Sequence, residues 1–469
     1  MREAAGAVAA AAAARSSARP RPLSFYGLLA VVLLSPLPFG AVGQWAWASL
    51  ALATALILCL WSLEVWRGAP VPRLGGFGGP LGLFALVLLW AAVQAWPGLP
   101  IALHHPIWAT ARSVLGQPLA GSVSVNPAAT LHGIVRLAAY AAILFLAFAH
   151  CRDPARARLA IIASAVAVAA YAGYGLIVFL GGSETILWFP KTAYIGDLTG
   201  TFVNRNAFAA YCGLGLLCLA ALLRRGLSRR TEVGGPMRER MRRHLEFLGG
   251  HGALCLGASV AVTVALLLTH SRGGLIAATI GLLVFLGLTV ASRAAPRRRA
   301  ALLGSVGALA AIALLAVSGE ATLSRLFDSR LESELRIAIY ERTLAAITDS
   351  PWTGTGLGTF RDVFQMYRTP AMERPLFRAH NTYLENAVEL GIPAAAALTA
   401  AVGWLAVACL MGALRRRRDA EFPCLAAAAT ALVASHALVD FSLQIPAVAA
   451  LYFLILGAGC AQSRSSRTR

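Results

Sequence analysis

Several short polar motifs in this sequence carry side chains that can bind an anion or move a proton. One runs from Thr269 to Gly274 and places Ser271 and Arg272 before two glycines. Ser271 can cap a following helix, and the exposed amides and dipole at a helix start favour negative charge. Arg272 can then contact a phosphate group. The structural alternative is an arginine that snorkels from a helical hairpin to the membrane surface.

A second motif contains Arg336, Tyr340 and Arg342 in a stretch with the apolar periodicity of a helix. Arg336 and Tyr340 are four residues apart and therefore share a helix face. The segment 351–360 follows, with a Gly-x-Gly-x-Gly pattern between aromatic residues. It lacks the lysine and hydroxyl residue of a phosphate-binding P-loop. We expect a flexible turn that packs its aromatic residues on the membrane surface.

A third motif combines Arg378, His380 and Asn381 with Glu385 and Glu389. A helix that begins near Asn381 would place Asn381 and Glu385 on one face. Histidine titrates near neutral pH and can accept a proton from a hydroxyl group. His380 is therefore a candidate base, although many histidines at membrane surfaces are only solvated or hydrogen-bonded.

A fourth motif places His436 four residues before Asp440 near the end of an apolar stretch. A carboxylate in or beside a membrane helix is costly, so we expect it to orient His436, to pair with an arginine, or to join helices. The segment Asn204-Arg205-Asn206 also precedes or begins an apolar stretch. It can either cap that helix or line a headgroup site.

Apolar stretches supply the elements that must position these motifs. The chain is 58% hydrophobic and 13% charged, with a mean hydropathy of +0.68. Soluble domains are only about 45–50% apolar, and a membrane-spanning helix needs roughly 20 apolar residues. We therefore expect an all-α polytopic membrane protein with about twelve spanning helices. The expected ranges are 23–42, 44–65, 81–98, 129–149, 158–180, 205–223, 251–269, 275–291, 300–318, 382–413, 423–440 and 444–461.

The stretch 382–413 is longer than one span and is interrupted by Gly391-Ile392-Pro393. This pattern predicts a short interfacial helix that leads into a spanning helix. The expected division of the chain is a cytoplasmic N-terminal tail (1–22), transmembrane helices 1–9 (23–318), a large helical periplasmic loop (319–381), transmembrane helices 10–12 (382–461) and a cytoplasmic tail (462–469).

Basic residues predict the topology. The net charge of +20 would suit a nucleic-acid partner, but most of the 41 lysines and arginines lie at the ends of apolar stretches in alternate loops. The positive-inside rule accounts for this pattern, so we expect no nucleic acid and two cytoplasmic termini. All the polar motifs would then face the periplasm of a bacterial inner membrane. None of the cysteines has metal-ligand spacing, and we expect no disulfide.

Together, the ordered motifs resemble the O-antigen ligases and the O-antigen and exopolysaccharide polymerases. The resemblance implies a GT-C-like membrane fold that transfers a glycan from undecaprenyl diphosphate to a sugar hydroxyl. It implies no cofactor and no metal. The acceptor would be lipid A core or a growing polysaccharide, and membrane lipids would surround the site. The motifs that carry the resemblance are Gly200 to Asn206, Ser271 to Gly274, Pro351 to Phe360, His380-Asn381 and His436 to Ala447.

The same resemblance assigns roles by motif position. Arg272 and Arg336 would hold the diphosphate, because a permanently charged planar guanidinium matches phosphate oxygens. His380 would activate the acceptor hydroxyl. Asp328, Glu332 and Glu334 lie close enough in the sequence to leave a metal site open. The expected substrate-binding residues are Asn204, Arg205, Asn206, Ser271, Tyr340, Arg342, Arg378, Asn381, His436 and Asp440.

Three other functions fit the sequence. A carrier or flippase for lipid-linked glycans would also have many spans and a cationic outer loop, although no inverted repeat is visible. A protein O-oligosaccharyltransferase would share the motifs, but the chain ends soon after the last apolar stretch, without the long soluble domain of some such members. A non-catalytic scaffold would use the charged loop only for docking.

Overall fold

The computed structural model describes most of the chain, and 73% of the described residues lie in helices, with almost no strand. This confirms the expected all-α polytopic membrane fold. The expected span 300–318 and much of the start of the 319–381 loop lie outside the described residues. The described ranges are 22–232, 237–292, 329–369, 372, 377–416 and 418–464.

Eight of the described helices are long and apolar enough to cross a membrane. They are α3 (Gln44–Trp66), α4 (Gly78–Ala95), α6 (Pro127–His150), α7 (Pro154–Leu180), α8 (Arg205–Glu232, apolar as far as Leu227), α10 (His251–Leu268), α11 (Arg272–Ala291) and α16 (Ile392–Arg415). Three shorter helices occupy other expected apolar stretches: α2 (Leu23–Leu34), α17 (Glu421–His436) and α18 (Pro446–Gln462).

Two of these helices are shorter than expected. Helix α2 ends at Leu34, not at residue 42, because Pro36 and Pro38 follow and cannot donate the backbone hydrogen bonds that a helix needs. Helix α17 ends at His436, not at 440, and the chain turns through hydrogen bonds from the Val439 and Asp440 amides to the His436 carbonyl. The second difference places Asp440 in a turn and not on a helix face.

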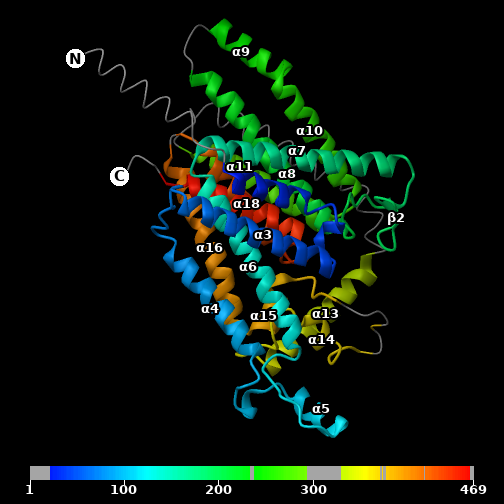
Figure 1. Cartoon of the computed structure of the whole chain (residues 1–469). Helices are drawn as coiled ribbons and strands as arrows, with labels where there is room; N and C mark the ends of the chain where they lie inside the picture. Colours follow the sequence, from blue (N-terminus) through cyan, green and yellow to red (C-terminus); the bar gives the residue numbers. More distant parts are fainter. Residues whose placement is uncertain are drawn as a thin grey trace, which may run out of the picture.

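The centre of the bundle is formed by α8, α17 and α18, whose residues are largely buried. Helix α11 packs on α17 and α8, α6 packs on α18, and α4 packs on α16 (Figure 1). Short helices then extend the bundle at its two ends. They are α5 (Ile107–Leu115), α9 (Met237–Gly249), α13 (Ser329–Asp349), α14 (Phe360–Phe364), α15 (Thr382–Leu390) and the 3-10 turns η1 (Phe39–Ala41), η2 (Ile101–Leu103) and η3 (Ser442–Gln444).

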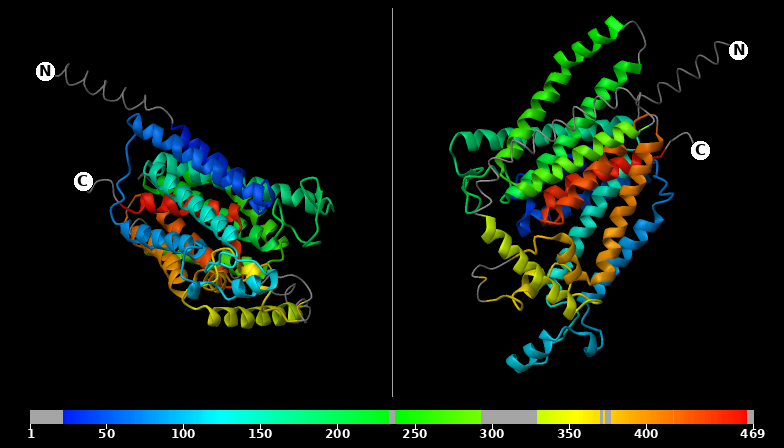
Figure 2. Two further views of the ribbon diagram at one scale, coloured as in Figure 1. Left: turned by 60° about the horizontal axis from the view of Figure 1, so that its bottom comes forward. Right: turned by 180° about the vertical axis from the view of Figure 1, so that it is seen from behind.

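These short helices divide between opposite ends of the molecule. Helices α5, α13, α14 and α15 gather at one end, called here the α15 end, whereas α9 projects from the other, the α9 end (Figures 1 and 2). A small antiparallel pair, β1 (Thr185–Ile186) with β2 (Phe189–Pro190), lies in the loop between α7 and α8. The polar motifs are therefore carried by elements that meet at the α15 end.

Gly391 separates α15 from α16, which confirms the predicted break. Its φ angle of +76° lies in the left-handed region, where a side chain causes strain. A Cβ atom at this position would also collide with the Trp352 carbonyl. Pro393 follows in the first turn of α16, where its missing N–H costs little.

The glycine-rich segment 354–358 is packed and is not the flexible surface turn that we expected. Gly356 has a φ of +107°, and a Cβ atom there would collide with Ser124 and Thr130. The Thr355 amide bonds the Val388 carbonyl at 2.9 Å, and the Gly356 amide bonds the Glu389 carbonyl at 2.9 Å. The glycines thus let this segment pass between α6 and α15.

Close packing of α17 and α18 predicts a strong effect of Gly459→Val. A Cβ atom at Gly459 would collide with Ala426, so valine should lower the free energy of unfolding by about 1–3 kcal/mol. The measurement is the thermal unfolding midpoint of the purified protein in detergent. Gly287→Val is the control, because a Cβ there meets nothing within 4 Å. Equal midpoints for the two variants would contradict this packing.

Candidate active site

His380 lies at the centre of the polar residues at the α15 end. It precedes α15 with a φ of +52°, and its carbonyl accepts a hydrogen bond from the Tyr340 hydroxyl at 3.0 Å. Its ring packs edge-on against Phe441, with centroids 5.0 Å apart. Tyr340 on α13 therefore fixes the backbone of His380, while Phe441 limits the orientation of the ring.

A buried carboxylate faces the His380 ring. The Asp440 side chain is 3% exposed, and its Oδ1 lies 3.3 Å from His380 Nδ1. Thr382 holds this turn, because its hydroxyl donates to the Asp440 carbonyl at 3.1 Å and its amide donates to the Ala437 carbonyl at 2.8 Å. We expected Asp440 to orient His436, to pair with an arginine or to join helices, and the closest ionisable group to its carboxylate is the His380 ring.

The surroundings of Asp440 favour its ionised form. Burial alone raises the pKa of this carboxyl group, but the contact with His380 and the nearby His436 outweigh burial. The net pKa lies below its usual value. At neutral pH an anionic carboxylate therefore faces Nδ1 of His380, which favours a proton on Nδ1 and leaves Nε2 as an acceptor.

The turn that carries Arg272 packs against the end of α17. Ser271 caps α11, since its Oγ accepts from the Gly274 amide at 3.1 Å. A Cβ atom at Gly273 would lie 3.5 Å from the His436 ring. His436 is buried, and its Nδ1 lies 2.8 Å from the Ser442 hydroxyl. Arg272 is the first residue of α11, so its backbone lies close to His436.

Arg336 approaches the same place from α13. Its charge acts on His436 and on Tyr340. In the part of the chain that the structure describes, neither Arg272 nor Arg336 has a hydrogen bond or an ion pair. Arg342 likewise has no hydrogen bond or ion pair with a described residue. It is exposed on α13, and no contact links it to the polar residues around His380.

Arg378, in contrast, is neutralised within the protein. Its Nη1 lies 2.8 Å from Glu385 Oε1, while Glu385 Oε2 accepts from the Ala379 amide at 3.0 Å. This ion pair holds the segment that leads into His380. Asn381 caps α15 by accepting from the Tyr383 and Leu384 amides, and its Nδ2 donates to the Leu438 carbonyl.

Asn204 also has a capping role, since its Oδ1 accepts from the Asn206 and Ala207 amides at the start of α8. Asn206 makes no side-chain hydrogen bond with another described residue. Arg205 pairs with Asp197 at 2.7 Å, and the other oxygen of Asp197 lies 2.7 Å from His270 Nδ1. Asp197 thus joins the start of α8 to the turn before α11. A lone acid in a loop gave no sequence signal for this role.

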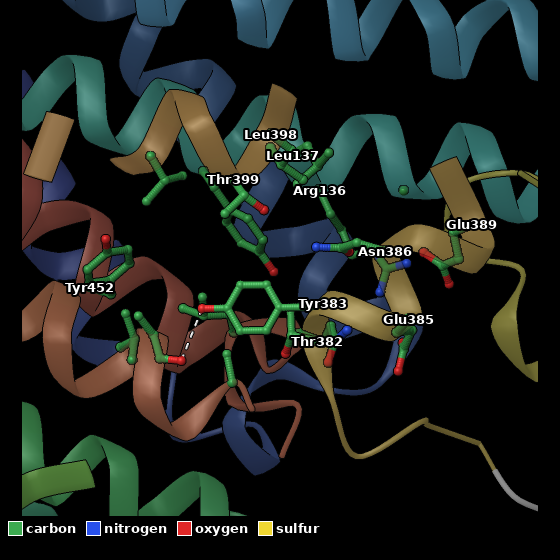
Figure 3. A pocket seen from close by; sticks show the side chains of 18 of the residues that line it. Arg136, Leu137, Thr382, Tyr383, Glu385, Asn386, Glu389, Leu398, Thr399 and Tyr452 are labelled. Carbon is green, nitrogen blue, oxygen red and sulfur yellow. Dashed lines mark hydrogen bonds between the residues drawn. The ribbon is translucent and has the colours of Figure 1, made fainter. Parts of the chain in front are cut away.

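A cavity of about 240 Å³ adjoins this cluster between α6, α15, α16, α17 and α18. Thr382 and Ala437, which hold the Asp440 turn, line one part of its wall. Arg136 from α6 and Asn386 from α15 also line it, as Figure 3 shows. Arg136 was not expected at the site, although an arginine inside an apolar span is a sequence signal for function.

Within the described residues, no group of three or more histidine, cysteine, aspartate or glutamate side chains is arranged to hold a metal ion. Asp328 and the side chains of Glu332 and Glu334 lie outside the described part. The described arrangement instead supplies a histidine with an anionic partner and two arginines without one. Such a group can accept a proton and bind a phosphate.

A comparison with protein families identifies this region. Residues 257–399 match the family model described as O-antigen ligase. This segment is similar to the O-antigen ligase domain. The match supports a glycosyltransferase-type role that involves lipid-linked glycans. No curated protein matched the chain in a sequence search.

The matched segment contains Arg272, Arg336 and His380. His436 at the end of α17, Asp440 in the turn that follows and Asp197 in the loop before α8 come from outside it. The candidate site is therefore completed by segments on both sides of the matched sequence.

The Asp197 bridge predicts a loss of stability in Asp197→Asn. Removing its charge weakens contacts to Arg205 and His270, which should cost about 1–3 kcal/mol. Chemical unfolding followed by tryptophan fluorescence would measure the change. Glu246→Gln breaks an exposed pair with Arg242 and should change stability by less than about 0.5 kcal/mol. Similar losses in both variants would show that Asp197 is not a structural bridge.

Proposed function

We propose that this protein transfers a glycan from undecaprenyl diphosphate to the hydroxyl group of a sugar acceptor. The observation that supports this most is the position of His380. Its Nδ1 faces the buried Asp440 carboxylate, the turn that carries Arg272 packs beside His436, and Arg336 lies within electrostatic range of His436. A base next to arginines without a carboxylate partner suits transfer of a glycan from a diphosphate.

In the proposed reaction the acceptor oxygen attacks the anomeric carbon of the donor glycan. His380 Nε2 takes the hydroxyl proton as the new glycosidic bond forms, and the bond from the anomeric carbon to the diphosphate oxygen breaks. The undecaprenyl diphosphate leaves with the bonding electrons. A single displacement of this kind inverts the anomeric configuration. The proton then leaves His380 to solvent, which restores the base.

Arg272 and Arg336 bind the diphosphate in this scheme. Negative charge grows on the leaving phosphate as the glycosidic bond breaks, and a fixed guanidinium stabilises that charge without reorganising. The start of α11 adds a favourable dipole at Arg272. The permanent charges of the arginines supply this stabilisation without a metal ion.

The side of the membrane that we assign to the site rests on where the basic residues lie along the bundle. Helix α9 and its arginines lie at the end opposite the site (Figure 2). Basic residues favour the cytoplasmic side, so we assign the α15 end to the periplasmic face of the inner membrane and both termini to the cytoplasm. The acceptor is then lipid A core or a growing polysaccharide.

His380→Ala should abolish transfer while the protein stays inserted and folded. A general base contributes roughly 10²–10⁴-fold to rate, so the remaining rate should fall by at least that factor. The assay incubates purified protein with synthetic undecaprenyl-diphosphate glycan and candidate acceptors, and mass spectrometry detects the product. Undiminished transfer would refute the role of His380. Movement of the donor between leaflets without a new bond would identify a carrier.

Asp440→Asn tests whether Asp440 positions the base. Losing the charge that faces His380 Nδ1 should cost about 1.5–3 kcal/mol, so kcat should fall by about ten- to hundredfold. The KM for the donor should change by less than about twofold, because Asp440 does not contact the diphosphate in this scheme. Arg272→Gln should instead raise that KM. A rise in donor KM with unchanged kcat in Asp440→Asn would contradict the positioning role.

A further inference from the structure

Arg136 is a charged residue without a carboxylate partner in a helix that can span the membrane. It lies about 14 Å along α6 from Pro127, given a rise of about 1.5 Å per residue. Helix α6 is apolar enough to cross the membrane. Within the described residues Arg136 has no ion pair and no hydrogen bond, and its guanidinium carbon lies 5.6 Å from the centroid of the Trp47 ring. Such a charge costs several kcal/mol unless something compensates it.

The acids that line the same cavity already have partners. Glu385 binds Arg378, and Glu389 accepts a hydrogen bond from the Phe360 amide at 3.1 Å. Burial, together with the nearby Glu385, raises the pKa of Glu389 to about 7, so near neutral pH a large fraction of this group is uncharged. Among the described residues neither acid forms an ion pair with Arg136, and Asn386 adds a side chain that can donate hydrogen bonds.

An apolar cavity of about 150 Å³ continues from the first one between α4, α6, α16 and α18. The two cavities share wall residues, among them Leu137, Leu398 and Phe453. The second is lined almost wholly by apolar side chains such as Phe77 and Phe148. A ligand that fills both needs an anionic head followed by an apolar chain.

Phe441 packs beside both His380 and Arg378. Its ring centroid lies 5.0 Å from that of the His380 ring and 5.8 Å from the Arg378 guanidinium. Arg378 lines the cavity, whereas neither Arg272 nor Arg336 does. The cavity and the proposed donor site are therefore two separate places with arginine side chains, and Phe441 and Arg378 connect the cavity to His380.

We propose that the Arg136 cavity binds the phosphate group of a lipid-linked acceptor, whose apolar chain occupies the adjoining cavity. This inference rests on the proposed transfer reaction and names the class of its acceptor: a phosphorylated lipid. Both lipid A and an undecaprenyl-diphosphate glycan have this chemistry. The donor diphosphate occupies Arg272 and Arg336, so the two lipids approach His380 from different sides.

The test counts bound lipids in the full-length protein. Native mass spectrometry of protein from phosphatidylcholine nanodiscs would measure binding of lipid A, undecaprenyl diphosphate and, as a probe without phosphate, undecaprenol. Arg136→Gln should weaken one phosphorylated-lipid site by about ten- to hundredfold and leave the other unchanged. Arg272→Gln should do the reverse. Undecaprenol should bind at least tenfold more weakly than either phosphorylated lipid.

The lipid that loses its site identifies the acceptor. Loss of lipid A binding in Arg136→Gln would indicate a ligase. If the wild-type protein binds two molecules of undecaprenyl diphosphate and Arg136→Gln binds only one, the protein would be a polymerase. Unchanged binding of both lipids would overturn the proposal. Arg158→Gln, at an exposed position on α7, is the matched control and should bind both lipids normally. If Arg136→Gln does not fold, Asn386→Leu tests the same cavity and should also weaken that site.

Kinetics distinguish this proposal from the transfer reaction itself. Arg136→Gln should raise the KM for the acceptor at least tenfold without changing the KM for the donor. His380→Ala should bind both lipids and transfer nothing. Transfer that survives His380→Ala would refute the base but not the cavity, whereas lipid binding that survives both Arg136→Gln and Asn386→Leu would refute the cavity alone.

Discussion

Asp440 carries a carboxylate that is almost completely buried at the end of α17, and much of the α15 end is arranged around this charge. A buried anion is stable only when positive or polar groups surround it. His380 supplies one such group, and Thr382 holds the turn by bonding two of its carbonyls. The start of α15, the end of α17 and α13 must therefore meet before His380 is placed.

The need to compensate a charge also divides the arginines into two groups, those that pair with a carboxylate and those that do not. Arg205, Arg225 and Arg378 each pair with a carboxylate, and the Arg225–Asp419 pair also connects segments that are far apart in sequence. Arg136, Arg272 and Arg336 have no carboxylate partner among the described residues. Arginines of the first group stabilise the fold, because their charges are compensated in the absence of any ligand. Those of the second group remain available to an anion.

Local sequence was sufficient to predict many features of this fold. Apolar length located the spans, Gly391 with Pro393 located the break before α16, and Ser271 was correctly expected to cap α11. Long-range pairing was not predictable. Nothing near Asp440 in the sequence indicates that His380 is its partner, and nothing near Asp197 indicates that it joins Arg205 to His270. Such contacts depend on how whole helices pack, which residue spacing does not encode.

The presence of two separate cationic regions near His380 bears on the geometry of transfer. A single displacement requires the attacking oxygen and the leaving oxygen to lie on opposite sides of the anomeric carbon. If both lipids entered from one side, their phosphate groups would repel each other and their chains would compete for one apolar path. Separate cationic sites for the two lipids avoid both problems. Each chain can then remain in the membrane while the two sugars meet at His380.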